Sequence, residues 1–147
     1  MPHINLSMTH NGPLVDVWLA VSEPRKVALT QAKLAVPAPV KIRALLDTGA
    51  SCTAIDPAVI TKLQVPVTGT TSILTPSTAG VAHTCNQYDV LLAILDPSGN
   101  PLYLGASVPV IESALASQGI EGLIGRDVLG GALFIYNGTA GHFTLSY

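Results

Sequence analysis

The sequence predicts an all-β domain of the sandwich or barrel type, with one or two short helices. Many short segments rich in β-branched and aromatic residues follow one another at close spacing, with turn residues between them. The length of 147 residues suits a single domain over residues 1–147. Hydrophobic residues make up 48% of the chain and charged residues only 11%, whereas soluble domains carry about 25% charged residues. We therefore expect some of the apolar surface to meet another chain.

Two strands are predicted in the first third of the chain. Residues 1–12 are polar, end in an Asn-Gly-Pro turn signal and are expected to be mobile. Leu14–Val21 has the length and composition of a strand. Val40–Leu46 is apolar enough for a strand that is buried on both faces. Between these strands, Val27–Leu34 is compatible with either a strand or a helix, and two prolines close the unit.

A short helix and a hairpin are predicted in the middle of the chain. Asp56 and Pro57 supply an N-cap acid and a proline at the first helical position, which is typical of a helix over residues 56–63. Residues 68–75 and 87–95 are expected to form the arms of a hairpin. Its tip consists of small residues and one proline: Pro76, Ser77, Thr78, Ala79 and Gly80.

The last third is predicted to contain two more strands, one helical turn and a closing hairpin. Residues 96–100 have the composition of a turn. A pair of glycines at 130 and 131 limits any helix that begins at Arg126 to about one turn. Strands are expected over residues 102–104, 108–111, 133–136 and 143–147.

Asp47 is the residue that most needs an explanation. It follows the apolar strand directly, at the point where Gly49 allows the backbone to turn sharply. One explanation is structural, because an Asp-x-Gly turn can use its carboxylate to cap backbone N–H groups. The other is that the carboxylate is placed there for chemistry.

The residues around Asp47 favour chemistry. Leu45-Leu46-Asp47-Thr48-Gly49-Ala50-Ser51 resembles the active-site loop of the aspartic proteases, in the retroviral form with Ala after the Gly. A second segment, Gly122–Leu129, resembles the apolar-apolar-Gly-Arg segment that these proteases carry about eighty residues later. The resemblance to the retropepsin-like aspartic proteases implies a closed β-barrel, the acid protease fold.

The resemblance also implies roles for the neighbouring residues. Thr48 would lock two loops together across a dimer, and the Gly49 backbone would lie close to the substrate. Ala50 has no hydroxyl to donate to the carboxylate, so one influence that lowers its pKa is absent. The hairpin tip at residues 76–80 would be the flap that covers the substrate, with an ordinary surface hairpin as the alternative.

Gly125 and Arg126 make up the structural motif of the second segment. Retroviral enzymes place an acid four residues after the catalytic Asp, where it pairs with this Arg, but that position here is Ser51. Arg126 must therefore find another partner or lie in solvent. We expect its role to be structural rather than substrate contact.

Peptide hydrolysis by carboxylates requires two of them, because one group takes a proton from water while another gives one away. The chain has a single Asp-Thr-Gly, and its other acids lack that context. The second carboxylate is therefore predicted to be Asp47 of another copy, since a two-fold dimer brings identical patches together.

Several classes of function are disfavoured. Seven Lys and Arg residues, scattered along a chain with a net charge of −2, argue against a nucleic-acid groove. Two cysteines, Cys52 and Cys85, and four unpaired histidines give no metal-ligand spacing, so we predict no metal and no cofactor. No apolar run is long enough for a membrane span, and the start lacks a signal peptide, so a cytoplasmic protein is expected.

The sequence thus predicts an aspartic endopeptidase that acts as a homodimer on a peptide or protein substrate. The alternative is a catalytically weak module of the same fold that mediates dimerisation or peptide binding. The motif would then persist as a structural turn.

Overall fold

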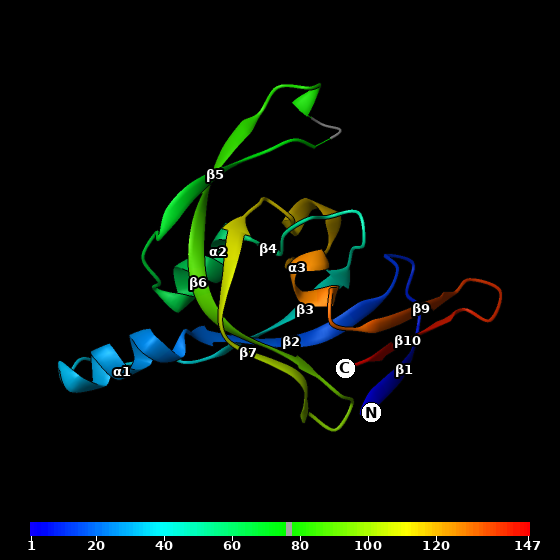
Figure 1. Ribbon diagram of the computed structural model, residues 1–147, viewed down its shortest axis with the longest axis horizontal. Helices are drawn as coiled ribbons and strands as arrows, with labels where there is room; N and C mark the ends of the chain where they lie inside the picture. The colour runs from blue at the N-terminus through cyan, green and yellow to red at the C-terminus, as the bar shows by residue number, and fades with distance from the viewer. Residues whose placement is uncertain (76–77) are drawn as a thin grey trace.

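Six strands close into a β-barrel in the computed structural model, which describes residues 1–75 and 78–147 (Figure 1). Neighbouring strands follow the order β2-β3-β8-β4-β7-β6, and a pairing of β2 with β6 closes the circle. Strand β5 (Gly69–Ile73) adds to β6 outside the circle. The barrel strands are β2 (Leu14–Val21), β3 (Val40–Leu46), β4 (Ala54–Ile55), β6 (His83–Leu95), β7 (Pro101–Glu112) and β8 (Gly122–Ile124). The predicted all-β class and closed barrel are confirmed.

A separate three-stranded sheet in the order β1-β10-β9 lies beside the barrel. It consists of β1 (His3–Ser7), β9 (Leu133–Asn137) and β10 (His142–Ser146). The predicted closing hairpin is the β9–β10 pair. Strand β1 lies in the segment 1–12, for which no strand was predicted; its backbone pairs with β10 and Ile4 is only 4% exposed.

Within the described residues, three short α-helices accompany the strands, with a 3₁₀ turn at Ala116–Gln118. Helix α1 (Glu23–Gln31) overlaps the segment Val27–Leu34, which was compatible with a strand or a helix, but begins four residues before it; none of the helix residues is buried. Figure 1 shows α1 projecting away from the barrel. Helix α2 (Pro57–Leu63) begins as predicted, with Asp56 accepting a hydrogen bond from the N–H of Ala58 at 2.9 Å. Helix α3 (Arg126–Leu129) is the predicted single turn.

The main core fills the barrel and continues beneath the smaller sheet. Its members come from all six barrel strands, from α2 and α3, from Ile4 of β1, and from Phe143 and Leu145 of β10, which are fully buried. This continuity explains why β1 and β10 are ordered: their apolar residues share one core with the barrel. Burial of such side chains contributes about 25 cal/mol for each Å² removed from water.

Strand β7 differs from its prediction. The expected segments 102–104 and 108–111 are parts of one strand, although Gly105 and its small neighbours interrupt the apolar pattern. The register of β6 against β7 shifts between Val90 and Leu92, so that an irregularity absorbs the interruption.

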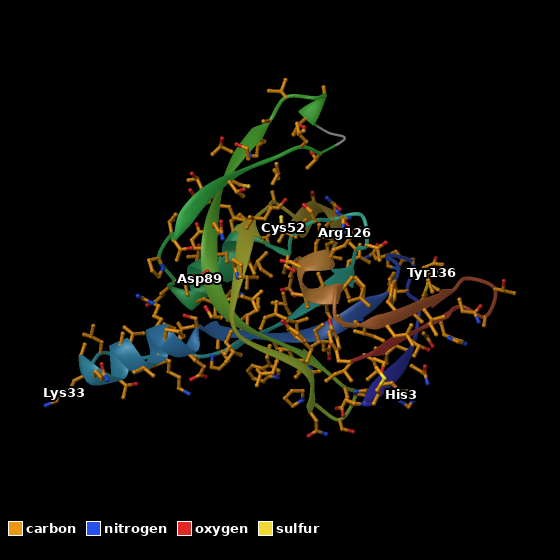
Figure 2. The ribbon with its side chains drawn as sticks, in the orientation of Figure 1. His3, Lys33, Cys52, Asp89, Arg126 and Tyr136 are labelled. Carbon is orange, nitrogen blue, oxygen red and sulfur yellow. The ribbon has the colours of Figure 1, made fainter. Side chains whose placement is uncertain are left out.

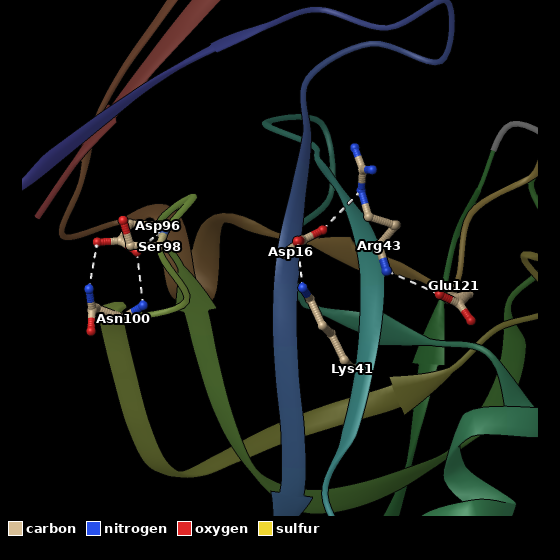
Figure 3. Close-up of polar contacts among 7 residues, drawn as sticks. All are labelled: Asp16, Lys41, Arg43, Asp96, Ser98, Asn100 and Glu121. Carbon is tan, nitrogen blue, oxygen red and sulfur yellow. Dashed lines mark hydrogen bonds and ion pairs between the residues drawn. The ribbon is translucent and has the colours of Figure 1, made fainter.

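Charged residues lie on the outer face of the barrel, as Figure 3 shows. Asp16 on β2 bonds to Lys41 and Arg43 of β3 at 2.9 and 3.2 Å. These side chains are exposed, so the ion pairs add little stability. In the turn between β6 and β7, Asp96 accepts hydrogen bonds from the backbone N–H groups of Ser98 and Asn100, both at 2.8 Å.

Within the described residues, no helix has the length and apolar character needed to cross a membrane.

Candidate active site

Asp47 lies one residue beyond the end of β3, where the chain leaves the barrel. Its backbone N–H donates to the carbonyl of Ile124 at 2.9 Å, which extends the parallel pairing of β3 with β8. Its Oδ1 accepts a hydrogen bond from the N–H of Gly49 at 2.8 Å. A Cβ at Gly49 would stand 3.0 Å from that oxygen, so the glycine suits the close approach. The carboxylate is half-buried, with one oxygen fixed by its own loop.

The segment after β8 fixes the loop from the other side. The Arg126 backbone N–H donates to the carbonyl of Ala50 at 3.0 Å, and Arg126 Nη1 donates to the carbonyl of Thr48 at 2.7 Å. Arg126 therefore contacts the backbone of the active-site loop in place of the missing acid at Ser51. The Thr48 side chain is exposed beside this contact.

A second anchor joins Thr53 to Asp127. The Thr53 side chain is completely buried. Its backbone N–H and its hydroxyl both donate to the Asp127 carboxylate, at 2.9 and 2.8 Å. The same hydroxyl accepts the N–H of Gly125 at 3.1 Å. A Cβ at Gly125 would stand 2.6 Å from the carbonyl of Cys52, so only glycine permits this approach.

A cavity of about 350 Å³ opens beside Asp47. Its walls are mostly apolar, and Asp47 is the one carboxylate among the described residues that line it. The lining comes from the loop after β3, from β4, from β5 and its continuation, from the end of β7 and from β8: Asp47, Gly49, Ala50, Ser51, Cys52, Ala54, Ile73, Leu74, Thr75, Ile111, Ser113 and Leu123. Such a cavity suits an uncharged apolar group placed next to a carboxylate.

The β5–β6 hairpin extends from the barrel on the side where the loop after β3 lies (Figure 1). The hairpin residues that line the cavity are Ile73, Leu74 and Thr75. Of the predicted tip, Thr78, Ala79 and Gly80 form a turn outside the cavity lining, and Pro76 and Ser77 lie outside the described residues. Gly80 has a φ of +81°, which suits its residue type.

The two cysteines differ in their surroundings. Cys52 is half-buried and lines the cavity; Figure 2 labels it between the barrel and the β5–β6 hairpin. Cys85 on β6 is buried, and this burial, helped by Cys52 and Glu112 nearby, raises the pKa of its thiol. Cys85 therefore stays a neutral, small apolar residue. Among the residues that the structure describes, no group of three His, Cys, Asp or Glu side chains could hold a metal ion.

The structure thus brings Asp47, Thr48, Gly49 and Ala50 together with Gly125 and Arg126. Thr53 and Asp127 were not predicted, because an isolated Thr and an Asp at a helix start look like ordinary polar residues in a sequence. Ile111 and Ser113 were also missed, since only the barrel geometry carries the end of β7 to the loop. In the sequence, Ile111 and Ser113 lie at the end of an apolar segment, and nothing in that pattern indicates a cavity.

Comparison with known proteins identifies the fold. Neither a family model nor a curated protein matches the sequence. The crystal structure of a retropepsin-like aspartic protease from Rickettsia conorii is similar, with a TM-score of 0.60 and 15% identity over 99% of this chain and 91% of that one. The retroviral protease-like domain of Ddi1 from Leishmania major gives a TM-score of 0.39 and 15% identity over 85% and 82% of the two chains, too low to argue from. With its closed barrel and full coverage by the Rickettsia structure, the chain has the fold of the retropepsin-like aspartic proteases.

Proposed function

We propose that the chain is an aspartic endopeptidase in which Asp47 of each subunit of a homodimer contributes one carboxylate. The observation that carries this proposal is the position of Asp47. It stands at the rim of an apolar cavity, in a loop fixed on both sides by hydrogen bonds. A carboxylate that only capped a turn would need neither the cavity nor the anchors from residues 125–127.

The chemistry needs one carboxylate to be ionised and the other to be protonated. The ionised Asp47 takes a proton from water as the water oxygen attacks the peptide carbonyl carbon, while the protonated Asp47 gives its proton to the carbonyl oxygen. When the C–N bond breaks, a carboxyl returns a proton to the leaving nitrogen. Two carboxylates about 3 Å apart share one proton, because both cannot ionise together.

Two further features support the proposal. The exposed Thr48 side chain is free to bond to a partner loop, because within the described part of this chain its hydroxyl has no hydrogen bond. The edge of β5 runs beside the cavity and offers backbone groups to an extended peptide, which would bind as an added strand. The hairpin would then cover the peptide and exclude water.

A peptide-library digest with purified protein tests the proposal. We expect cleavage beside apolar residues, and we expect Asp47→Asn to abolish it, because an amide cannot take a proton from water. The matched control is Asp16→Asn, which changes an acid on β2 that pairs with Lys41 and does not line the cavity, and it should leave the rate unchanged. Peptides that bind to the wild type without being cut would support the peptide-binding module instead.

Dilution tests the need for two copies. The specific activity should fall as the concentration drops through the dimer dissociation constant. Sedimentation of a monomer that keeps full specific activity would contradict the shared pair of carboxylates.

A further inference from the structure

Glu112 is the last residue of β7, and its carboxylate holds two side chains of β6. The amide Nδ2 of Asn86 donates to Glu112 Oε1 at 2.6 Å, and the hydroxyl of Tyr88 donates to Glu112 Oε2 at 3.0 Å. Each carboxylate oxygen therefore has a donor of its own. Hydrogen bonds to an ionised group are about twice as strong as those between neutral groups, so the three residues form a firm contact, the Glu112 clamp.

The clamp spans the point where β6 leaves the barrel. Toward the hairpin tip, Gln87 is the last residue of β6 that pairs with strands on both sides, β5 and β7. In the described part of the chain, residues 83–86 pair with β5 alone. Tyr88 therefore belongs to the barrel wall, whereas Asn86 belongs to the arm of the β5–β6 hairpin. Because Glu112 bonds to both, it fixes the arm relative to the barrel.

The hairpin that starts at this point forms one wall of the cavity beside Asp47, through Ile73, Leu74 and Thr75. Strand β5 stands at the end of its sheet, and in the described residues its one partner strand is β6. The direction of the hairpin therefore depends on β6. Figure 1 shows the hairpin extending beyond the barrel, so a small rotation at its base produces a larger displacement of the cavity wall.

The donors of the clamp keep their protons. Burial, and then the hydrogen bond to Glu112, raises the pKa of Tyr88, and the amide of Asn86 does not titrate. A different contact ties the two hairpin arms to each other: the backbone N–H and the hydroxyl of Thr68 donate to the carbonyl of Gln87, at 2.8 and 3.1 Å. Thr68 thus preserves the hairpin itself, while Glu112 joins the hairpin to β7.

We infer that Glu112 is a positioning residue, whose carboxylate fixes the β5–β6 hairpin at the angle at which the hairpin walls the cavity beside Asp47. Glu112 does not line that cavity, so it acts through Asn86 and the hairpin and not by contact with a substrate. The inference rests on the proposed function for the reaction that the hairpin serves. The position of the hairpin can nevertheless be measured without that reaction.

Asn86→Asp tests the clamp, because it preserves the size of the side chain and places a second carboxylate against Glu112. A bond of 2.6 Å is replaced by repulsion, so the hairpin should open more often. Opening exposes Cys52, which is half-buried in the cavity wall. We expect Cys52 to react with N-ethylmaleimide roughly tenfold faster than in the wild type. Mass spectrometry of peptides separates its labelling from that of Cys85.

Two further variants control for the charge. Asn86→Asp/Glu112→Gln exchanges donor and acceptor: the amide at position 112 donates to the carboxylate at position 86, and its oxygen still accepts from Tyr88. Labelling of Cys52 should return to nearly the wild-type rate. The matched control is Asn100→Asp, since Asn100 donates to Asp96 at 3.3 Å in the exposed turn at the other end of β6 and β7. It should leave the labelling rate unchanged.

Circular dichroism establishes that each variant is folded. If Asn86→Asp does not fold, Asn86→Ala replaces it, because it removes the donor without adding a charge and should still speed the labelling of Cys52. A wild-type labelling rate in the folded Asn86 variant would overturn the inference, as would a double variant that labels as fast as Asn86→Asp.

Steady-state kinetics on a cleaved peptide distinguish positioning from a purely structural role. Asn86→Asp should raise KM more than it lowers kcat, because the hairpin contacts the bound peptide while the Asp47 carboxylates are unchanged. The double variant should restore KM. Faster labelling of Cys52 with an unchanged KM would overturn the positioning role.

The outcomes also separate this inference from the proposed function. Labelling of Cys52 that responds to Asn86→Asp and is rescued by the double variant, in a protein that cuts no peptide, would overturn the function and leave the clamp. Cleavage that depends on Asp47, with labelling indifferent to Asn86→Asp, would overturn the clamp and leave the function.

Discussion

Replacing Thr53 by Val should loosen the loop that carries Asp47 while preserving its shape. Valine has nearly the same volume, so the change removes the hydroxyl and leaves the packing largely intact. That hydroxyl is completely buried, donates to Asp127 at 2.8 Å and accepts the N–H of Gly125 at 3.1 Å. The substitution therefore removes one bond to a carboxylate and leaves one buried N–H without a partner.

The magnitude follows from these two losses. A hydrogen bond to a charged group contributes about 1.5–3 kcal/mol, and an unsatisfied buried donor costs about 1–3 kcal/mol. Because Asp127 keeps two other donors, the N–H groups of Thr53 and Val128, part of the first loss is recovered. We expect a decrease of about 2–4 kcal/mol in the free energy of unfolding, or roughly 6–12 °C in Tm for a chain of this size.

Urea denaturation of four proteins gives the measurement: wild type, Thr53→Val, Asp127→Asn and the double variant. The two single changes affect the same contact, so their sum should exceed the effect of the double variant by about 0.5–3 kcal/mol. Thr53→Ser is the matched control, because it keeps the hydroxyl and should cost only about 1 kcal/mol for the lost methyl group.

Two results would refute this account of the anchor. One is a Thr53→Val protein within about 0.5 kcal/mol of the wild type, the range expected of an unimportant surface change. The other is strict additivity of the two single variants, since residues that form one hydrogen-bonded unit are coupled.

Three further predictions concern neighbouring features. Gly125→Ala should destabilise the fold by at least about 3 kcal/mol in denaturant titrations, because its Cβ would stand 2.6 Å from the Cys52 carbonyl, whereas Gly131→Ala, with nothing within 4 Å, should be nearly neutral. The N–H of Ala58, with those of Leu115 and Ala116, holds the pKa of Asp56 below its ordinary value. The Asp56 carboxylate therefore stabilises the fold fully at any pH above the ordinary pKa, and it loses this contribution as the pH falls through the lowered pKa. Asp56→Ala should decrease the free energy of unfolding by about 2–4 kcal/mol at neutral pH, and the Tm of the variant should fall less steeply than that of the wild type as the solution is made acid. If the proposed function holds, the rate should be bell-shaped in pH, and Ala50→Ser should move both limbs to lower pH by donating a hydroxyl to the Asp47 pair; limbs that do not move would exclude residue 50 from contact with the pair.

Strands β2 and β3 were predicted with their observed bounds, because apolar and β-branched residues between turn residues leave few alternatives. The expectation that β3 is buried on both faces is wrong, because the exposed Lys41 and Arg43 alternate with buried apolar residues, so that one face of the strand points outward. Strand β1 was missed, since its five residues contain only Ile4 and Leu6 as apolar members, and their pairing with β10 depends on a strand almost 140 positions later. The segment of helix α1 could not be assigned to a strand or a helix, for a related reason. The helix buries no residue, so its sequence lacks the apolar stripe that distinguishes a packed helix.

The candidate site was predictable where chemistry fixes the residue type and unpredictable where backbone atoms complete it. Asp47 and Gly49 could be identified from the motif. The partner of Arg126 is the carbonyl of Thr48, and a carbonyl is present at every residue, so no sequence pattern marks it. The Thr53–Asp127 contact joins residues 74 positions apart, which only the crossing of β3, β4 and β8 brings together.

These long separations affect how the protein is made. The contacts that hold the Asp47 loop come from residues 124–127, which are synthesised 72 to 78 positions after their partners. Contacts between distant residues form late in folding, because the chain must first close a large loop.

A nascent chain that has emerged only as far as the β5–β6 hairpin therefore carries Asp47 in a loop without its anchors. The loop acquires its shape only after β8 and α3 have left the ribosome and docked. If the protein is a protease, the order of its synthesis keeps the nascent chain inactive until residues 124–127 have emerged and docked.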